Sequence, residues 1–190
     1  MRISYILSMI IGGLLLMSLI TLKNNFIASS HESTFAIISH SETDNLRQMI
    51  TRDLRHIGFG QDSKVLNFSD DHIRFRARIE GSNQVVSWRI MPGNNASYAN
   101  PNLKQLRRQG PLGESPQSQT HNFPVKTFQI TAYSDMNGLI ETEDKDEVRS
   151  VRVDLVLESE QAIGTRHDGS PKHSRSAWSK LIRPQNMMYQ

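Results

Sequence analysis

Histidine, cysteine and the acidic residues build most catalytic and metal sites, and their spacing in this sequence indicates no catalytic site. The seven histidines are spread along the 190 residues, and none belongs to a His-Glu-x-x-His zinc motif. Cysteine is absent, which excludes disulfides, thiol catalysis, iron–sulfur clusters and cysteine-ligated zinc. The sequence also lacks a glycine-rich phosphate loop and a Gly-x-Ser-x-Gly nucleophile elbow. We therefore predict that the protein is not an enzyme.

Oxygen ligands are concentrated in residues 135–146. This segment contains Asp135, Asn137, Glu141, Glu143, Asp144 and Asp146. Calcium takes 6–8 oxygen ligands, which makes the segment a candidate calcium loop, but the spacing does not fit an EF-hand. An exposed acidic turn fits the sequence better. We predict no cofactor, with calcium in the 135–146 loop as the weaker alternative.

Basic residues form a strip on one predicted strand. Arg74, Arg76 and Arg78 alternate with apolar residues from Ile73 to Ile79, which places the arginines on one face. Such a strip, extended by Arg89 and Arg107-Arg108, could bind the phosphates of DNA. We expect Asp154 and Glu158, on the outer face of another strand, to pair with it, and Phe75 and Trp88 to face the core. A net charge of +3 is also small for a nucleic-acid-binding protein. A solvated sheet face is the favoured interpretation, and nucleic acid the less favoured partner.

The N-terminus carries a candidate membrane span. Residues 3–22 contain no charged side chain, and a helix of that length spans roughly 30 Å, the thickness of a bilayer's hydrocarbon core. We assign residues 1–25 to this anchor, with a helix-packing face at Gly12, Gly13, Leu16 and Ile20. The flanking charges, Arg2 and Lys23, weakly favour a cytoplasmic N-terminus. The predicted location is therefore the inner membrane, single-pass, with the rest of the chain periplasmic or in a cell-surface filament.

Two alternatives concern processing of this segment. The small residues Ala28-Ser29-Ser30 could end a cleaved signal peptide and release a soluble domain that begins at His31. An uncharged run of 20 residues is longer than the roughly 7–15 of a usual signal core, which argues against this alternative. Gly12-Gly13 could also be a degenerate peptidase site rather than a packing notch.

We predict that residues 26–58 form an amphipathic continuation of the same helix. A stripe at helical spacing, predicted to pack on a sheet, consists of Leu46, Met49, Ile50, Leu54 and Ile57. Gly58 suits the left-handed position that ends many helices.

Residues 59–190 show strand periodicity. We predict a hairpin from 73–79 and 85–91, then strands at 125–134, 148–158 and 177–183. We predict a long irregular loop at residues 92–124 and a polar loop at residues 163–174. The predicted fold class is α+β, with a long N-terminal helix packed on an antiparallel sheet of about four strands.

Four stretches together resemble the minor pilins of type IV pili (PilW-like) and the J-type pseudopilins of type II secretion. They are the helix end at 52–60 (RDLRHIGFG), the hairpin at 73–90, the strand and turn at 128–138 (FQITAYSDMNG), and the closing strands at 148–159 with the ending at 182–186 (IRPQN). Members of this family are processed after a glycine and carry a glutamate at mature position five. Here cleavage after Gly13 would put Ser18 at that position, and no acidic residue precedes Glu32.

The resemblance implies a pilin-like fold and a structural role. The expected function is that of a minor pilin-like or pseudopilin-like subunit of a type IV pilus, type II secretion or DNA-uptake apparatus. Its expected partners are other pilin or pseudopilin subunits, contacted through the N-terminal helix. The alternative is a single-span membrane-anchored periplasmic module that binds DNA or an envelope ligand and is not assembled into a filament.

Overall fold

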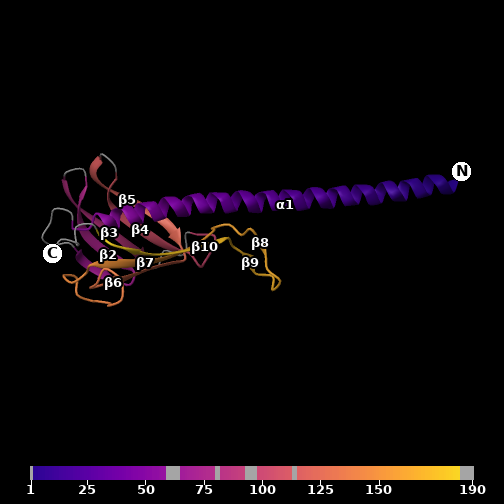
Figure 1. Cartoon of the computed structure of the whole chain (residues 1–190). Helices are drawn as coiled ribbons and strands as arrows, with labels where there is room; N and C mark the ends of the chain where they lie inside the picture. The colour runs from indigo at the N-terminus through magenta and orange to yellow at the C-terminus, as the bar shows by residue number, and fades with distance from the viewer. Residues whose placement is uncertain (1, 59–64, 80–81, 93–97, 113–114, 185–190) are drawn as a thin grey trace.

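A computed structural model of the chain consists of one long helix with a β-domain at its C-terminal end (Figure 1). The structure describes residues 2–58, 65–79, 82–92, 98–112 and 115–184. Helix α1, Arg2–Arg55, has 54 residues, so its length is roughly 80 Å at about 1.5 Å per residue. Its N-terminal part extends away from the domain, and its C-terminal turns lie on the strands (Figure 1). The helix continues without a break across the predicted boundary between residues 25 and 26, and its first buried residue among those described is Thr43.

The C-terminal end of α1 is attached directly to the sheet. The last turn is tight, because the backbone N–H groups of His56 and Ile57 donate to the carbonyls of Asp53 and Leu54 at 3.2 and 3.3 Å. Gly58 adopts φ 73°, which confirms the predicted left-handed position. Its N–H donates to the carbonyl of Arg76 at 2.9 Å, so the chain joins the neighbouring strand as it leaves the helix.

The β-domain contains two main antiparallel sheets, so the prediction of one sheet with about four strands was wrong. The larger sheet has five strands in the order β1-β2-β3-β4-β5. Their bounds are Val65–Ser69, His72–Ile79, Ser82–Met91, Lys104–Leu112 and Ser115–Val125. The smaller sheet has the order β10-β7-β6, with bounds Arg175–Ile182, Ser150–Glu158 and Thr127–Tyr133. A short hairpin of β8, Gly164–Thr165, and β9, Pro171–Lys172, lies within the predicted polar loop.

The long loop predicted at 92–124 was also wrong, because β4 and β5 form a hairpin there. A polar residue, Arg108, occupies a buried inward position of β4 between Leu106 and Gly110, so the apolar alternation that marks a strand is missing. Strand β5 lies at the edge of the sheet, where its prolines, Pro116 and Pro124, are tolerated.

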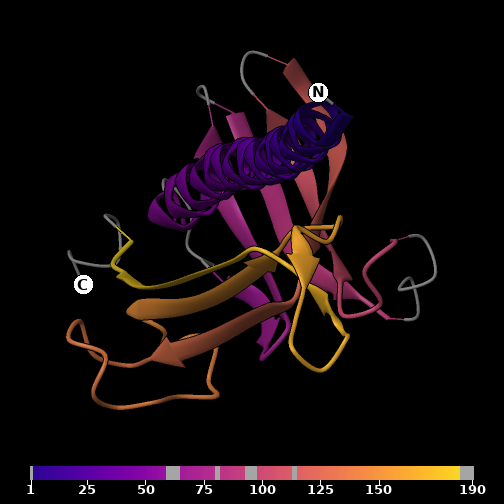
Figure 2. The ribbon, with the colours of Figure 1, turned by 90° about the vertical axis from the view of Figure 1, so that its right-hand side faces the viewer.

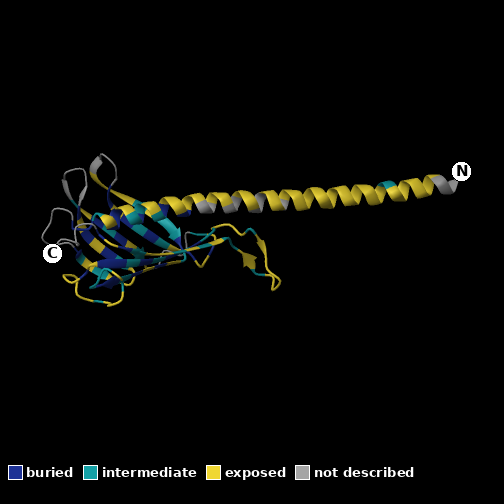
Figure 3. Ribbon diagram, viewed as in Figure 1, coloured by how far each residue is buried: buried dark blue, intermediate teal, exposed yellow. Residues whose placement is uncertain are grey.

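The core lies between α1 and the inner faces of both sheets. From the N-terminal side, α1 crosses the five-stranded sheet, and the three-stranded sheet lies alongside (Figure 2). Burial is concentrated where the three layers meet (Figure 3). Trp88 of β3 joins the two sheets, because its ring stacks on Phe123 at 6.0 Å between centroids and contacts Phe128 of β6 at 6.5 Å.

Candidate functional site

The N-terminal half of α1 is an apolar surface with no partner among the described residues. Tyr5–Ile27 has a mean hydropathy of 2.2 and is long enough to cross a membrane, and none of its most apolar window is buried. Leu16 and Ile20 are exposed, and a Cβ added at Gly12 or Gly13 would meet no atom within 4 Å. Gly12, Leu16 and Ile20 are four residues apart and share one helix face. The predicted packing face therefore contacts nothing among the described residues.

The apolar stripe predicted to join helix and sheet lies in the core. Leu46, Ile50 and Leu54 are fully buried on α1, and Ile57 is buried just beyond the helix, where it forms a bridge to Ala77. Met49 is half-buried and packs against the edge of the same cluster. Each fully buried aliphatic side chain contributes about 1.5–3 kcal/mol, so this stripe fixes the domain on the helix.

A buried ion pair between α1 and β4 was not predicted from the sequence. Arg108 donates through Nε to Oδ2 of Asp53 at 2.7 Å and through Nη2 to Oδ1 at 3.3 Å. Trp88 Nε1 also donates to Oδ2, at 3.1 Å, and both residues of the pair are at most 1% exposed. Nη1 and Nη2 also donate to the carbonyls of Gly110 and Pro111, at 3.1 and 2.8 Å. Each guanidinium nitrogen of Arg108 and each carboxylate oxygen of Asp53 thus has a hydrogen-bond partner, which suits a structural role rather than a reactive site.

The predicted basic strip lies on the outer face of the five-stranded sheet. Arg74 and Arg76 are exposed there, whereas the side chain of Arg78 lies outside the described residues. The strand register aligns His72, Arg89 and Arg107 in one row across β2, β3 and β4. Burial and the neighbouring Arg89 lower the pKa of His72, against the smaller opposing effect of Asp71.

Two expectations about this strip were wrong. Arg108 does not extend it, because its side chain turns inward to Asp53. Asp154 and Glu158 do not neutralise it, because they lie on β7 in the other sheet. Glu158 instead binds Lys126 at 2.5 Å. Burial alone would raise the pKa of Glu158, but hydrogen bonds from Lys126 and Asn100 hold it below its usual range.

The acidic loop after β6 is organised by its first carboxylate. Oδ2 of Asp135 accepts from the backbone N–H of Asn137 at 2.8 Å, and Oδ1 accepts from Leu139 and Ile140 at 2.8 and 2.9 Å. These bonds, that of Ile140 first, hold the pKa of Asp135 below its usual range. No group of three or more metal-ligating side chains was found among the described residues, which include all of 135–146. Asp135 therefore serves as a turn cap.

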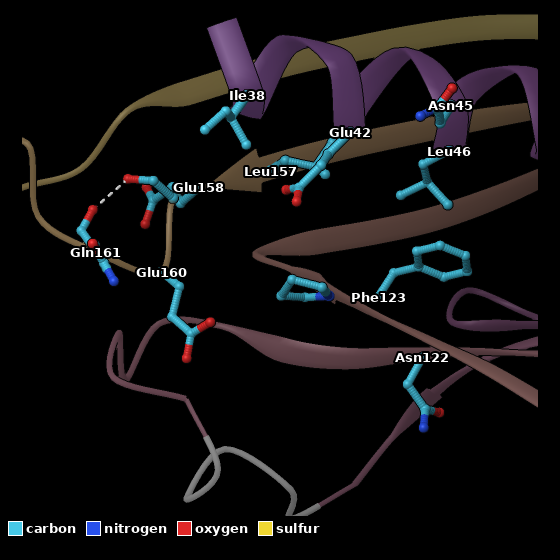
Figure 4. Close-up of a pocket in the computed structure, with 12 residues that line it drawn as sticks. Ile38, Glu42, Asn45, Leu46, Asn122, Phe123, Leu157, Glu158, Glu160 and Gln161 are labelled. Atoms are coloured by element: carbon cyan, nitrogen blue, oxygen red, sulfur yellow. Dashed lines mark hydrogen bonds between the residues drawn. The ribbon is translucent and has the colours of Figure 1, made fainter. Parts of the chain in front are cut away.

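Two grooves of opposite charge flank α1 where it meets the domain. The first, about 480 Å³, has an apolar floor that includes Leu46 and Phe123 and a rim with Glu42 and Glu160 (Figure 4). The second lies between α1 and β10. Its charged lining residues are Arg47, Arg52, Arg55 and Lys180, with Trp178 and His56 beside them. These grooves combine residues from distant parts of the chain, so no local motif indicates them.

No protein-family model, curated protein or solved structure matches this chain in the comparisons.

Proposed function

We propose that the chain is a structural, membrane-anchored subunit, minor pilin-like or pseudopilin-like, of a type IV pilus, type II secretion or DNA-uptake apparatus. One observation carries the proposal: a single unbroken helix has an unburied, mostly apolar stretch at Tyr5–Ile27 and packs onto a β-domain with its last turns. Such a chain places its apolar half among lipids or neighbouring helices and holds its domain outside the membrane.

The same helix supports the proposed location. We place the anchor in the inner membrane with the N-terminus cytoplasmic and the domain periplasmic or in a cell-surface filament. The partners are other pilin or pseudopilin subunits, packed through the face of Gly12, Leu16 and Ile20. The glycines at 12 and 13 favour close approach of a neighbouring helix, because they carry no side chain. No contact within the chain itself requires glycine there, since an added Cβ would meet no atom within 4 Å.

The two charged grooves also support side-by-side packing of copies. Glu42 and Leu46 project from the opposite side of α1 to Thr51 and Arg55, so the acidic and basic grooves face different directions. They are offset by roughly 13–14 Å along the helix. Two parallel copies shifted by that distance would bring an acidic groove beside a basic groove. A contact of this head-to-tail kind does not close on itself and builds an open helical array.

Photo-crosslinking tests which chains surround the helix in native membranes. A photoreactive phenylalanine analogue replaces Leu16 or Ile20 on the packing face, and Leu14 or Ser18 on the opposite face as matched controls. We expect discrete protein adducts from positions 16 and 20, with crosslinked peptides that lie in apolar N-terminal helices. Lipid adducts alone at all four positions would overturn assembly through this face.

The intact mass of the chain purified from membranes tests processing. A start at Leu14 supports prepilin-type cleavage and filament assembly. An intact Met1 supports the alternative of an uncleaved anchored module. A start at His31 would contradict the membrane anchor itself.

A further inference from the structure

The five-stranded sheet has an unusual charge composition. Its five strands contain no aspartate or glutamate, whereas the whole chain has 19. The same strands contain the basic residues Arg74, Arg76, Arg78, Arg89, Lys104, Arg107 and Arg108. Among those whose side chains the structure describes, only Arg108 forms an ion pair with a carboxylate, and it is buried on the inner face. The acidic residues are placed elsewhere, with five of them in the Glu141–Glu147 loop.

Arg74, Arg76, Arg89 and Arg107 lie on the outer face, away from α1. His72 pairs with Arg89, and Arg89 with Arg107, so one row crosses three strands. Directly opposed side chains on neighbouring strands lie about 4.5–5.5 Å apart at Cβ, and like charges in such a pair, here Arg89 and Arg107, are destabilising. No acidic side chain interrupts the row within the described strands. A bound anion would relieve this repulsion.

Neutral hydrogen-bonding side chains complete the face. The next row of the register crosses all five strands through Asn67, Arg74, Ser87, Gln109 and Thr120. Arginine, serine, threonine, asparagine and glutamine are the side chains that contact phosphate oxygens in protein–DNA complexes. The large aromatic rings of β2 and β3, Phe75 and Trp88, are fully buried on the other face. They cannot stack on bases, so the face suits a nucleic-acid backbone rather than its sequence.

The position of the face excludes lipid headgroups as the source of phosphate. The span ends at Ile27 and the first core residue of α1 is Leu46, so the domain begins roughly 30 Å along the helix from the membrane end. Figure 1 shows the sheet at the far end of α1.

We infer that the outer face of the five-stranded sheet, with Arg74, Arg76, Arg89 and Arg107, binds the phosphate backbone of duplex DNA without reading its sequence. This inference does not depend on the proposed structural role. A filament subunit and a solitary anchored module would present the same face.

Salt-dependent DNA binding tests the inference. The full chain is placed in nanodiscs of zwitterionic phosphatidylcholine and titrated with a fluorescent duplex of mixed sequence. Four arginine–phosphate contacts predict a slope of about −3.6 for log K against log salt, or a loss of about a hundredfold between roughly 50 and 200 mM salt. Removal of two contacts in R74Q/R76Q or R89Q/R107Q predicts a slope of about −1.8.

A matched control distinguishes DNA binding by this face from a general effect of the chain's net charge. R55Q/K180Q removes the same two charges from the basic groove beside α1, and we expect it to keep the wild-type slope. No binding at low salt would overturn the inference, as would an equal loss in the control. Sedimentation of the full chain without DNA tests the other candidate partner of this face, the acidic Glu141–Glu147 loop of a second copy. Self-association that R74Q/R76Q abolishes, together with absent DNA binding, would assign the face to that loop instead.

Discussion

At the residue scale, the charges of Asp53 and Arg108 are buried but fully paired. Both carboxylate oxygens accept hydrogen bonds, and the guanidinium also donates to two carbonyls of its own strand. A buried pair of this kind gains little over a well-packed apolar pair, but loss of one partner leaves an uncompensated charge. The pair therefore specifies where α1 sits on β4 more than it adds to stability.

Replacement of one partner of this pair should be costly. We expect Arg108→Met to destabilise the domain by about 3–5 kcal/mol, because the Asp53 carboxylate stays buried without its cation. The double variant D53L/R108M should recover most of that loss. Urea unfolding of the full chain in detergent, followed by tryptophan fluorescence, measures both. A double variant as unstable as the sum of its two single variants would show that the residues are not coupled.

The Asp135 turn should depend on pH. Its pKa is lowered in the folded chain, so the stabilisation is present above the unfolded pKa of about 3.9 and is lost as the pH falls through the lower folded value. Hydrogen exchange at the amides of Leu139 and Ile140 should accelerate, relative to the intrinsic rate, only below about pH 4. In Asp135→Asn the protection should be weaker and should not change with pH over that range. Unchanged protection in the variant would contradict the capping role.

At the element scale, the junction between α1 and β2 depends on one backbone conformation. Gly58 is buried with φ 73° and donates to Arg76. The left-handed region costs an L-residue about 1–2 kcal/mol, so Gly58→Ala should lower the stability by that amount. Gly164→Ala is the matched control, because an added Cβ there meets nothing within 4 Å and its φ is not in the left-handed region. Thermal unfolding compares the two variants. Equal melting temperatures would show that the junction tolerates a side chain.

The elements that could be predicted are those in which the buried residues recur at one regular spacing, either helical or alternating. The stripe from Leu46 to Leu54 and the alternation in β2 and β7 each place apolar residues on a single buried face. Strand β4 was missed because its inward residue Arg108 is charged, and its partner Asp53 lies 55 positions earlier. Strand β1 was missed because a register shift between Val65 and Asn67 breaks its short alternation.

The features of the candidate sites also differ in whether a local sequence pattern reveals them. The exposed arginines of β2 were visible as an alternating pattern. Their extension to Arg107 required the register of β3 with β4, which no local pattern reveals. The absence of acidic partners for these arginines likewise became evident only when Asp154 and Glu158 were placed on the other sheet.

At the scale of the whole molecule, acidic and basic side chains are grouped on different sides of the protein. Acidic side chains lie on one flank of α1 and in the loop after β6, whereas basic side chains lie on the other flank and on the outer sheet face. A molecule with separated charges of this kind favours one relative orientation of neighbouring copies.

Charge exchange between the two grooves should test that orientation. We expect Glu42→Arg or Arg55→Glu alone to reduce crosslinking at positions 16 and 20, because like charges then meet between shifted copies. The double variant restores opposite charges and should restore the adducts. Asp168→Arg, on an exposed turn away from both grooves, is a control for charge alone. Loss of adducts in the double variant would contradict contact between the grooves.

The unbroken α1 also fixes how the domain is rotated about the helix axis relative to the apolar N-terminal segment. Residues 28–45 carry no proline, and the helix continues through them without interruption. Each residue turns the helix by about 100° and advances it by about 1.5 Å. One residue inserted between Ile27 and Leu46 would therefore point the basic sheet face in a new direction while leaving both the span and the core intact. The number of residues in this segment, and not only their chemistry, determines which way the domain faces its neighbours.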